Sequence, residues 1–286
     1  MLIQREKETK EEHEFAGAGT PDLNTMSRNF DPDPAAKMLE SAWRSGRQLT
    51  ELPAAVRPMT INEGYDTQDR LLRLLGARTV GWKLGVGSPK ALKAANLARP
   101  MIGQVIETER YESGATVKIS STTPVTIEFE VAYVLARDVA PGSAPARALD
   151  AVAETRATLE LVHSRFTNRR AVGWPSFAAD DSAFRALVVG DILDSTTTES
   201  LFDAVVVFED DHAVARGLRG DDRTDSVGSL TALFAHAAER NITLRSGEIV
   251  STGAVAQPFE SSDSTVVITA RYGSTALQVR IERTAT

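Results

Sequence analysis

Two glutamates separated by a single residue, Glu128 and Glu130, are the side chains of this sequence best suited to carry chemistry. They interrupt the run 126–135, whose β-branched and aromatic residues alternate in the manner typical of a β-strand. Because successive side chains of a strand point to opposite faces, the two carboxylates share one face. Carboxylates held together on an apolar strand repel each other and lose hydration, which a divalent cation relieves. A water-exposed strand edge is the commoner explanation of a bare Glu-x-Glu.

A third carboxylate strengthens the metal hypothesis. Glu160 stands alone among aliphatic residues in the segment 156–166, which is predicted to be a buried strand. A carboxylate in such a place needs a partner, and a glutamate pair needs a third ligand to hold a cation. Three carboxylates from two strands predict a Mg²⁺ or Mn²⁺ site, with coordination positions left for water and substrate.

The fourth candidate is a lysine. Lys83 lies in the predicted strand 79–89, which is punctuated by three glycines. A lysine in this setting either extends along its aliphatic stem to the surface or is held near an anion, and the segment alone favours neither. The glycines do not form a phosphate loop, because the Gly-x-Gly-x-x-Gly pattern fails at Lys90 and Walker spacing is absent.

Composition narrows the functional classes. The chain has 286 residues, 42% hydrophobic and 25% charged, enough for one large domain or two unequal ones. It has no cysteine, which excludes disulfides, thiolate metal sites and a cysteine nucleophile. The net charge of -7 and the lack of a basic stripe argue against nucleic acid as a partner, and no apolar run is long enough to cross a membrane.

The elements that must position these side chains follow from periodicity and from turn residues. Helices are predicted at residues 33–46, 60–76, 89–98, 146–154 and 226–240. Strands are predicted at residues 79–89, 103–106, 116–119, 126–135, 156–166, 186–190, 204–208, 212–217, 247–253, 265–270 and 276–281. The polar, irregular segment 167–181 is expected to form a loop or short lid over a site.

Many short strands after residue 100 and few helices predict an α+β fold. Its core is expected to be a mixed β-roll or distorted barrel with a small N-terminal helical cap. The predicted division is a disordered tail at 1–30, an N-terminal α/β cap at 31–100 and a β-roll catalytic domain at 101–286.

Several short motifs occur in one order along the chain. They are Tyr65-x-x-Gln68, Gly81-Trp82-Lys83-Leu84-Gly85, Pro100-x-x-Gly103, Glu128-Phe129-Glu130-Val131-Ala132, Glu160-Leu161-Val162-x-Ser164-Arg165, Ala179-Asp180-x-Ser182 and Leu244-x-x-Gly247-x-x-Val250-x-Thr252-Gly253. Each motif is weak by itself, but the ordered set resembles the 2-keto-4-pentenoate hydratases and 2-oxo-3-enoate decarboxylases of the fumarylacetoacetate hydrolase superfamily. The resemblance extends from about Asp33 to the C-terminus.

The resemblance implies a Mg²⁺- or Mn²⁺-dependent lyase of aromatic or related catabolism, cytoplasmic and homo-oligomeric, with a small 2-oxo acid as substrate. The family's metal ligands match Glu128, Glu130 and Glu160, and its active-site lysine and serine match Lys83 and Ser182. Other matching motif positions imply substrate-binding roles. They are Leu84, Ser164, Arg165 and Thr252.

The sequence also departs from the family pattern around this set. Met101 stands where many hydratases carry an acidic residue credited with steering water, and Asp181 replaces the usual Asn. His163 replaces an Asp, and we expect a core or supporting role for it. The function implied is hydration of a short 2-hydroxydienoate or 2-oxo-enoate through a metal-chelated dienolate. Alternatives are a decarboxylase or carbon–carbon hydrolase using the same site, which the change at Met101 favours, or a non-catalytic partner subunit.

Overall fold

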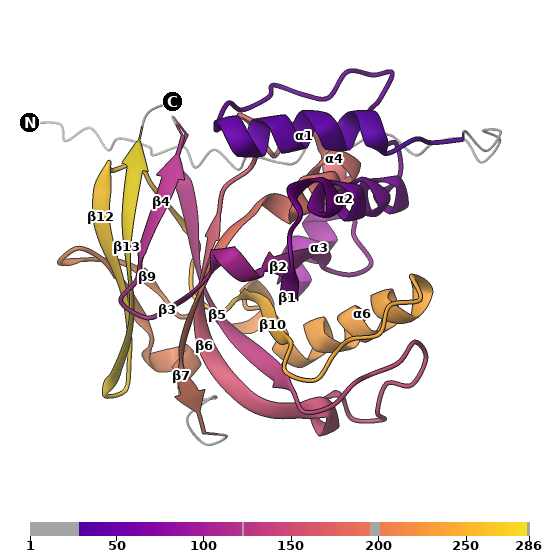
Figure 1. Cartoon of the computed structure of the whole chain (residues 1–286). Helices are drawn as coiled ribbons and strands as arrows, with labels where there is room; N and C mark the ends of the chain where they lie inside the picture. The colour runs from indigo at the N-terminus through magenta and orange to yellow at the C-terminus, as the bar shows by residue number, and fades with distance from the viewer. Residues whose placement is uncertain (1–28, 122, 195–200, 285–286) are drawn as a thin grey trace, which may run out of the picture.

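The computed structural model describes residues 29–121, 123–194 and 201–284, and the predicted tail at 1–30 lies almost wholly outside them. Figure 1 shows two β-sheets side by side, with helices gathered on the far side of the larger sheet. The chain has an α+β architecture, and the long strands of the larger sheet curve as in an open barrel. The predicted fold class is therefore confirmed.

Two helices begin the described chain, as predicted. Helix α1 spans Asp33–Ser45 and helix α2 spans Ile61–Leu75. Helix α2 starts with a capping box, in which the Thr60 hydroxyl accepts from the Glu63 amide and the Glu63 carboxylate accepts from the Thr60 amide. It ends at Gly76, whose φ of 64° is the left-handed conformation that closes many helices.

The larger sheet has the strand order β2-β1-β10-β5-β6-β7-β3, and β11 pairs with one end of β5. Its strands are β1 Thr79–Gly85, β2 Met101–Ile106, β3 Arg110–Glu112, β5 Val125–Leu135, β6 Val152–Val162, β7 Phe184–Leu193, β10 Ile249–Ala254 and β11 Phe259–Ser261. Strand β1, from the N-terminal part of the chain, pairs with both β2 and β10. The division of the chain at residue 100 stays a prediction.

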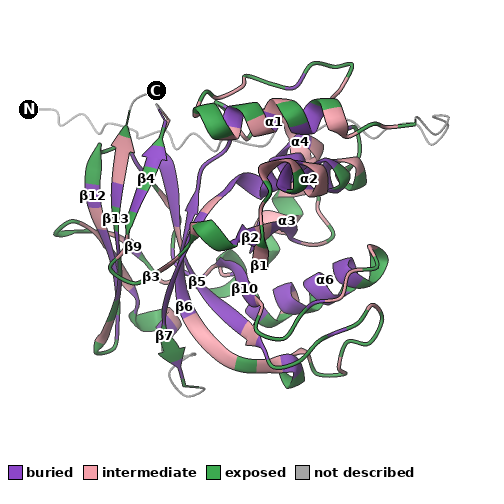
Figure 2. Ribbon diagram, viewed as in Figure 1, coloured by how far each residue is buried: buried purple, intermediate pink, exposed green. Residues whose placement is uncertain are grey.

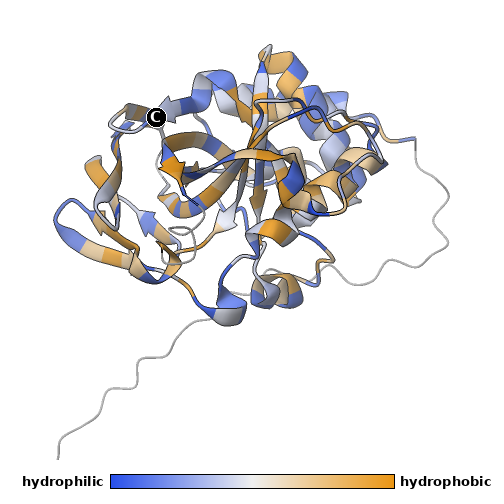
Figure 3. Cartoon of the chain, turned by 90° about the horizontal axis from the view of Figure 1, so that it is seen from below, coloured by the Kyte–Doolittle hydropathy of each residue, from blue (hydrophilic) through white to orange (hydrophobic). Residues whose placement is uncertain are grey.

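The smaller sheet has the order β4-β13-β12-β8-β9. Its strands are β4 Thr116–Ser120, β8 Val206–Glu209, β9 His212–Arg216, β12 Thr265–Tyr272 and β13 Thr275–Thr284. Buried and exposed residues alternate along β4 and β13, and Figure 3 shows hydrophobic and hydrophilic bands on this sheet. This period of two indicates one face packed on the core and the other facing water.

The two sheets pack through the apolar face of β5. The ring centroids of Phe129 on β5 and Tyr272 on β12 lie 5.5 Å apart, and both side chains are buried. Ile127 and Val131 belong to the same cluster as Phe129. In Figure 2 strand β5 is almost continuously buried, and β6 is buried over its second half, from Ala157 to Val162. The opposite face of β5, which carries Glu128 and Glu130, is thereby turned away from the smaller sheet.

Three further α-helices lie wholly within the described residues, and residues 201–204 are helical as well. The three are α3 Pro89–Ala95, α4 Gly173–Ala179 and α6 Ser226–Glu239, with 3-10 turns at Glu107–Glu109, Ala148–Ala151, Asp181–Ala183 and Gly220–Asp222. Over residues 29–121, 123–194 and 201–284, no helix is both long and apolar enough to cross a membrane.

One predicted helix was wrong, and one predicted loop is partly helical. The helix expected at 146–154 is only a 3-10 turn, because the chain from Val152 onward is strand β6, paired along its whole length with β5. Tertiary strand pairing here outweighs a local alanine-rich preference for helix. The segment 167–181, expected to form a loop or short lid over a site, contains helix α4, which packs against α2, and its role as a lid stays a prediction.

Strand β1 lies so close to β10 that Gly81 is required. A Cβ atom at this position would lie 2.1 Å from the Ile249 carbonyl oxygen, which is part of the parallel β1–β10 pairing. We expect Gly81→Ala to reduce the free energy of unfolding by about 3 kcal/mol or more, because backbone cannot move aside as a side chain can. Urea unfolding measures this loss.

The matched control is Gly85→Ala on the same strand, where the nearest atom to an added Cβ is Lys83 Nζ at 3.6 Å. We expect that variant to stay within about 1 kcal/mol of the parent chain. Equal stability of the two variants would contradict this account of Gly81.

Candidate metal centre

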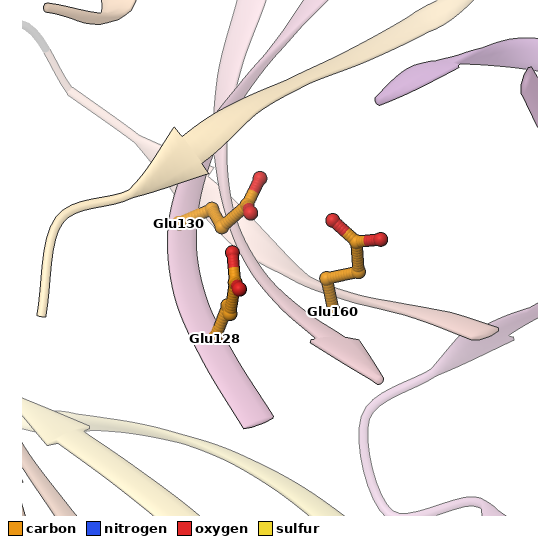
Figure 4. Close-up of side chains that lie close together, drawn as sticks. All are labelled: Glu128, Glu130 and Glu160. Atoms are coloured by element: carbon orange, nitrogen blue, oxygen red, sulfur yellow. The ribbon is translucent and has the colours of Figure 1, made fainter. Parts of the chain in front are cut away.

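The register of β5 and β6 brings the three predicted carboxylates together. Glu128 is paired directly with Glu160 across the two antiparallel strands, and Glu130 is two residues along on the same face. One oxygen from each of the three carboxylates lies within 4.8 Å of the other two. Figure 4 shows the three side chains extending from the two strands into one region. The convergence predicted from the sequence is confirmed.

The three glutamates differ in burial and in hydrogen bonding. Glu130 and Glu160 are fully buried, whereas Glu128 is half-buried and lines a cavity. Glu130 Oε2 accepts hydrogen bonds from Ser251 Oγ at 2.6 Å and from the Gly253 amide at 2.9 Å. Glu130 Oε1 and Glu160 Oε2 are buried and accept no hydrogen bond from any described residue. Two oxygens are thus desolvated and left with lone pairs available to a ligand.

Lys83 lies against this cluster. Its side chain is only 2% exposed, and Nζ is 2.9 Å from Glu160 Oε1 in an ion pair. The ammonium also donates a hydrogen bond to the Ser182 carbonyl oxygen at 2.9 Å. Of the two roles left open by the sequence, the lysine held near an anion is correct, and extension to the surface is wrong.

Burial and mutual repulsion dominate the electrostatics. Burial, followed by repulsion from Glu160 and Glu128, raises the pKa of Glu130 well above its usual value. Burial raises the pKa of Glu160 to about 7 despite the nearby Lys83 ammonium. For Lys83, burial disfavours the charged form, but the three carboxylates together outweigh burial and raise its pKa. The lysine is therefore charged at neutral pH.

The donor set fits a hard divalent cation. All three groups offer carboxylate oxygens, the ligands that Mg²⁺ and Mn²⁺ prefer, and two of the oxygens have no other partner in the described chain. If all three are ionised beside the Lys83 ammonium, two negative charges stay uncompensated in a buried site. One divalent cation supplies the charge needed to balance them.

An unusual backbone segment holds the carbonyl that meets Lys83. Asp181, Ser182 and Ala183 have φ angles of 50°, 49° and 62°, three consecutive non-glycine residues in the left-handed region. Each such residue costs on the order of 1–2 kcal/mol, so tertiary contacts must hold the segment. The Ser182 hydroxyl donates to the Ile102 carbonyl oxygen at 2.9 Å. At the entry to this segment, the Asp180 carboxylate pairs with the buried Arg165 guanidinium.

A cavity of about 770 Å³ opens beside the cluster. Its wall includes Lys83 from β1 and Glu128 from β5, so both the cation and one carboxylate are accessible to a small molecule. Trp174, Phe177 and Phe259 give it apolar surface. A wall with both cationic and apolar side chains suits a small anionic organic substrate.

The structure places the remaining predicted residues around the cavity without adding them to its wall. Leu84 is fully buried in the core, and the Thr252 hydroxyl donates to the Val131 carbonyl oxygen. Ser164 Oγ and the Arg165 guanidinium both bond to the Asp180 carboxylate. Their assigned roles in substrate binding, and that of Ser182 in catalysis, stay predictions.

His163 lies in the core, as expected. Its Nε2 is 2.6 Å from the Ser121 hydroxyl and 3.1 Å from the Thr123 hydroxyl, away from the glutamates. Burial lowers its pKa to about 3, so it is neutral. Asp180 is also fully buried, and its carboxylate forms the ion pair with Arg165.

Sequence reasoning missed two residues that shape the site, Ser251 and Arg169, and named a third, Asp181, only as a departure from the family pattern. Ser251 orients Glu130, and Asp181 is buried beside Gly103 with its pKa raised to about 8 by burial. Arg169 lines the cavity next to Glu128. Ser251 and Arg169 carry no local signal, because contacts between distant segments create their roles. Asp181 did carry one, since it replaces the Asn usual in the resembling family.

Metal affinity should depend on pH. Glu160 and Glu130 must lose protons to bind a cation, and their raised pKa values make that loss incomplete at acidic pH. We expect Mn²⁺ or Mg²⁺ to bind roughly tenfold or more tightly at pH 8 than at pH 6, as measured by calorimetry. Glu128→Gln should weaken binding at both pH values.

The control for that variant is Glu154→Gln, which removes a carboxylate from the same strand as Glu160, where it pairs with Arg156. It should bind metal as the parent chain does. Undiminished metal binding by Glu128→Gln would remove that residue from the centre.

Stability without metal should fall as pH rises. The pKa of Glu160 is about 7 in the folded chain against an ordinary 4.5, so between these values the folded state holds a proton that the unfolded chain has released. Its contribution to stability is therefore full below about pH 4.5 and is lost as pH rises towards 7. We expect Mg²⁺ to reverse the loss, and thermal melting with and without Mg²⁺ across this range checks it. A melting temperature that rose with pH in Glu160→Gln and parent alike would contradict this assignment.

Comparison with known proteins agrees with the geometry. No protein-family model matches the chain. The sequence is 24% identical over 249 residues to a 2-hydroxyhexa-2,4-dienoate hydratase of Comamonas testosteroni, covering 84% of this chain and 94% of the relative. It is 25% identical over 222 residues to a 4-oxalocrotonate decarboxylase of a Pseudomonas species, covering 77% of this chain and 86% of the relative.

A solved structure of a protein with the same name as the second relative has the same fold as this chain. The 4-oxalocrotonate decarboxylase of Pseudomonas putida G7, solved with magnesium and adipate, superimposes with a TM-score of 0.75 at 20% identity. The match covers 87% of this chain and 97% of that one. Over most of its length the chain is thus similar in sequence to hydratases and a decarboxylase of 2-oxo-enoate compounds, and it has the fold of the 4-oxalocrotonate decarboxylase.

Proposed function

We propose that this chain is a lyase that uses a divalent metal, Mg²⁺ or Mn²⁺, to hydrate a short 2-hydroxydienoate or 2-oxo-enoate. The observation that carries the proposal is the cluster of Glu128, Glu130 and Glu160 with Lys83 at the wall of a cavity. Relatives that align over most of the chain are named as hydratases and as a decarboxylase, which agrees with this chemistry.

Each residue of the site has a separable task. Glu128, Glu130 and Glu160 would hold the cation, which when bound supplies positive charge that stabilises the dienolate of a 2-oxo acid. Ser251 and the Gly253 amide fix Glu130 in place, so its free oxygen is preorganised. The apolar side chains Trp174 and Phe177 exclude water from the hydrocarbon part of the substrate.

Lys83 is the residue that contacts substrate. An ammonium has three N–H donors, of which one faces Glu160 and one the Ser182 carbonyl. The third is free to donate to the enolate oxygen or carboxylate of a substrate in the cavity. The hydrogen bond from such a donor becomes stronger as negative charge develops on the substrate. The donor is already in position before the substrate binds.

The second candidate is decarboxylation or carbon–carbon hydrolysis of a related 2-oxo acid in the same site. The observation in its favour is Met101, which is 1% exposed in the core where many hydratases carry an acidic side chain. A non-catalytic partner subunit is disfavoured, because such a subunit would be free to lose Lys83 or one of the buried glutamates.

A substrate panel tests these proposals. Purified protein with Mg²⁺ or Mn²⁺ is incubated with 2-hydroxypenta-2,4-dienoate and with 4-oxalocrotonate, and both dienol absorbance and CO₂ release are followed. Loss of the dienol without CO₂ supports the hydratase, and CO₂ release supports the decarboxylase. Absence of turnover across a panel that includes longer dienoates and acylpyruvates would contradict an enzymatic role.

The Lys83→Ala variant tests the role of the lysine. We expect turnover to fall roughly 10²–10³-fold, because the variant lacks a preorganised donor to the developing charge. The carboxylates remain, so the cation should still bind. Steady-state kinetics and metal calorimetry on the same preparation measure both effects. Wild-type turnover in this variant would remove Lys83 from the reaction.

The homo-oligomeric state and the cytoplasmic location implied by the resemblance stay predictions. Light scattering of the purified chain measures its mass in solution and tests the first of them.

A further inference from the structure

Arg169 is a cation in the cavity wall for which the described chain supplies no carboxylate partner. It lies between β6 and α4 and is half-buried. Its guanidinium donates one hydrogen bond, to the Thr126 hydroxyl at 2.9 Å, and forms no ion pair within the described ranges. The neighbouring cations do have carboxylate partners. Arg170 pairs with Glu260 at 3.8 Å, and Lys90 pairs with Asp222 at 3.0 Å.

This arrangement leaves the charge and most of the N–H donors of Arg169 without a direct partner among the described residues. Burial lowers its pKa, whereas Glu128 and Glu260 attract the guanidinium without contacting it. A guanidinium has five N–H donors in a rigid fork that matches a carboxylate, and only one donor of Arg169 has an acceptor among the residues that the structure describes. A carboxylate entering the cavity would satisfy the remaining donors in a desolvated place, where such a bond is strong.

The position of Arg169 sets a distance from the metal centre. Thr126, which holds Arg169, is two residues before Glu128 on β5, and side chains two apart on a strand share a face about 6.6 Å apart. A chain of about five or six carbons, with bonds of about 1.5 Å, spans a similar length. The apolar side chains of Trp174 and Phe259 line the same cavity and suit the carbons between the two ends.

We propose that Arg169 binds a second carboxylate of the substrate, so that the site prefers 2-oxo dicarboxylates to 2-oxo monocarboxylates of the same length. The 2-oxo acid end lies at the glutamate cluster and Lys83, and the distal carboxylate lies in the fork of Arg169. This inference rests on the proposed function, because it takes the glutamate cluster as the place where the 2-oxo acid binds.

The competing explanation is that Arg169 only balances the charge of Glu128. In that case its loss would change metal affinity and leave the choice between mono- and dicarboxylates unaltered. The two explanations therefore differ in a measurement that needs no turnover.

The test uses 2-oxoadipate and 2-oxohexanoate, which have the same chain length and differ only in the distal carboxylate. Neither has the carbon–carbon double bond on which hydration acts, so binding is measured by calorimetry with saturating Mn²⁺. We expect the parent chain to bind 2-oxoadipate roughly 10- to 100-fold more tightly. Arg169→Gln should lose that preference and keep its affinity for 2-oxohexanoate. Arg169→Lys should retain part of the preference, because the lysine ammonium still attracts a carboxylate as a point charge.

The matched control is Arg170→Gln, which removes the same charge from the adjacent, exposed residue and should keep the preference within about threefold. Equal binding of both ligands by the parent chain would overturn the role of Arg169 and leave the proposed function standing. The role of Arg169 would also be overturned if Arg169→Gln kept the preference for 2-oxoadipate, or if the only effect of that substitution were a changed affinity for Mn²⁺. If neither ligand binds the parent chain, both this inference and the proposed chelation of a 2-oxo acid are wrong.

Discussion

The cost of burying charge is the constraint on which the rest of this structure depends. Three carboxylates and one ammonium lie within a few ångströms of one another, and Lys83, Glu130 and Glu160 are almost entirely removed from water. Such a group is strongly unfavourable unless each charge finds a partner. Lys83 balances one carboxylate, and a divalent cation would balance the other two when all three are ionised. Without a cation, protons on Glu130 and Glu160 relieve the same cost, which is why the pKa values of both are raised.

The two faces of β5 explain how the fold tolerates this group. One face, with Phe129 against Tyr272, packs on the smaller sheet and contributes to the hydrophobic core. The other face places Glu128 and Glu130 opposite β6, away from that core. Because alternation along a strand is strict, the same eleven residues can serve the core and the site at once. The long pairing of β5 with β6 fixes the register on which the glutamate cluster depends.

Buried polar contacts outside the cluster hold it in place. The Arg165–Asp180 ion pair and the Ser182–Ile102 hydrogen bond keep the left-handed segment that directs the Ser182 carbonyl to Lys83. The motif residues Ser164, Arg165 and Ser182 support the site from behind and do not line the cavity, unlike Lys83 and Glu128. A motif residue can therefore matter to catalysis by positioning another group. Arg169 is the reverse case, a cavity residue in none of the motifs.

The sequence by itself determined the strand pattern and the two N-terminal helices, because alternation and capping are local rules. It also predicted that Glu160 meets Glu128 and Glu130, because a lone carboxylate on an apolar strand needs a partner, but the register of β5 on β6 is what brings them together. It could not determine whether Lys83 faced water or an anion, since that depends on pairing β1 with β2 and β10. It also misplaced a helix at 146–154, where pairing with β5 decides the conformation. The burial of Asp180 with Arg165, the orientation of Glu130 by Ser251 and the place of Arg169 in the cavity were decided by tertiary structure alone. Each joins segments far apart in the chain, and no local preference encodes such a contact.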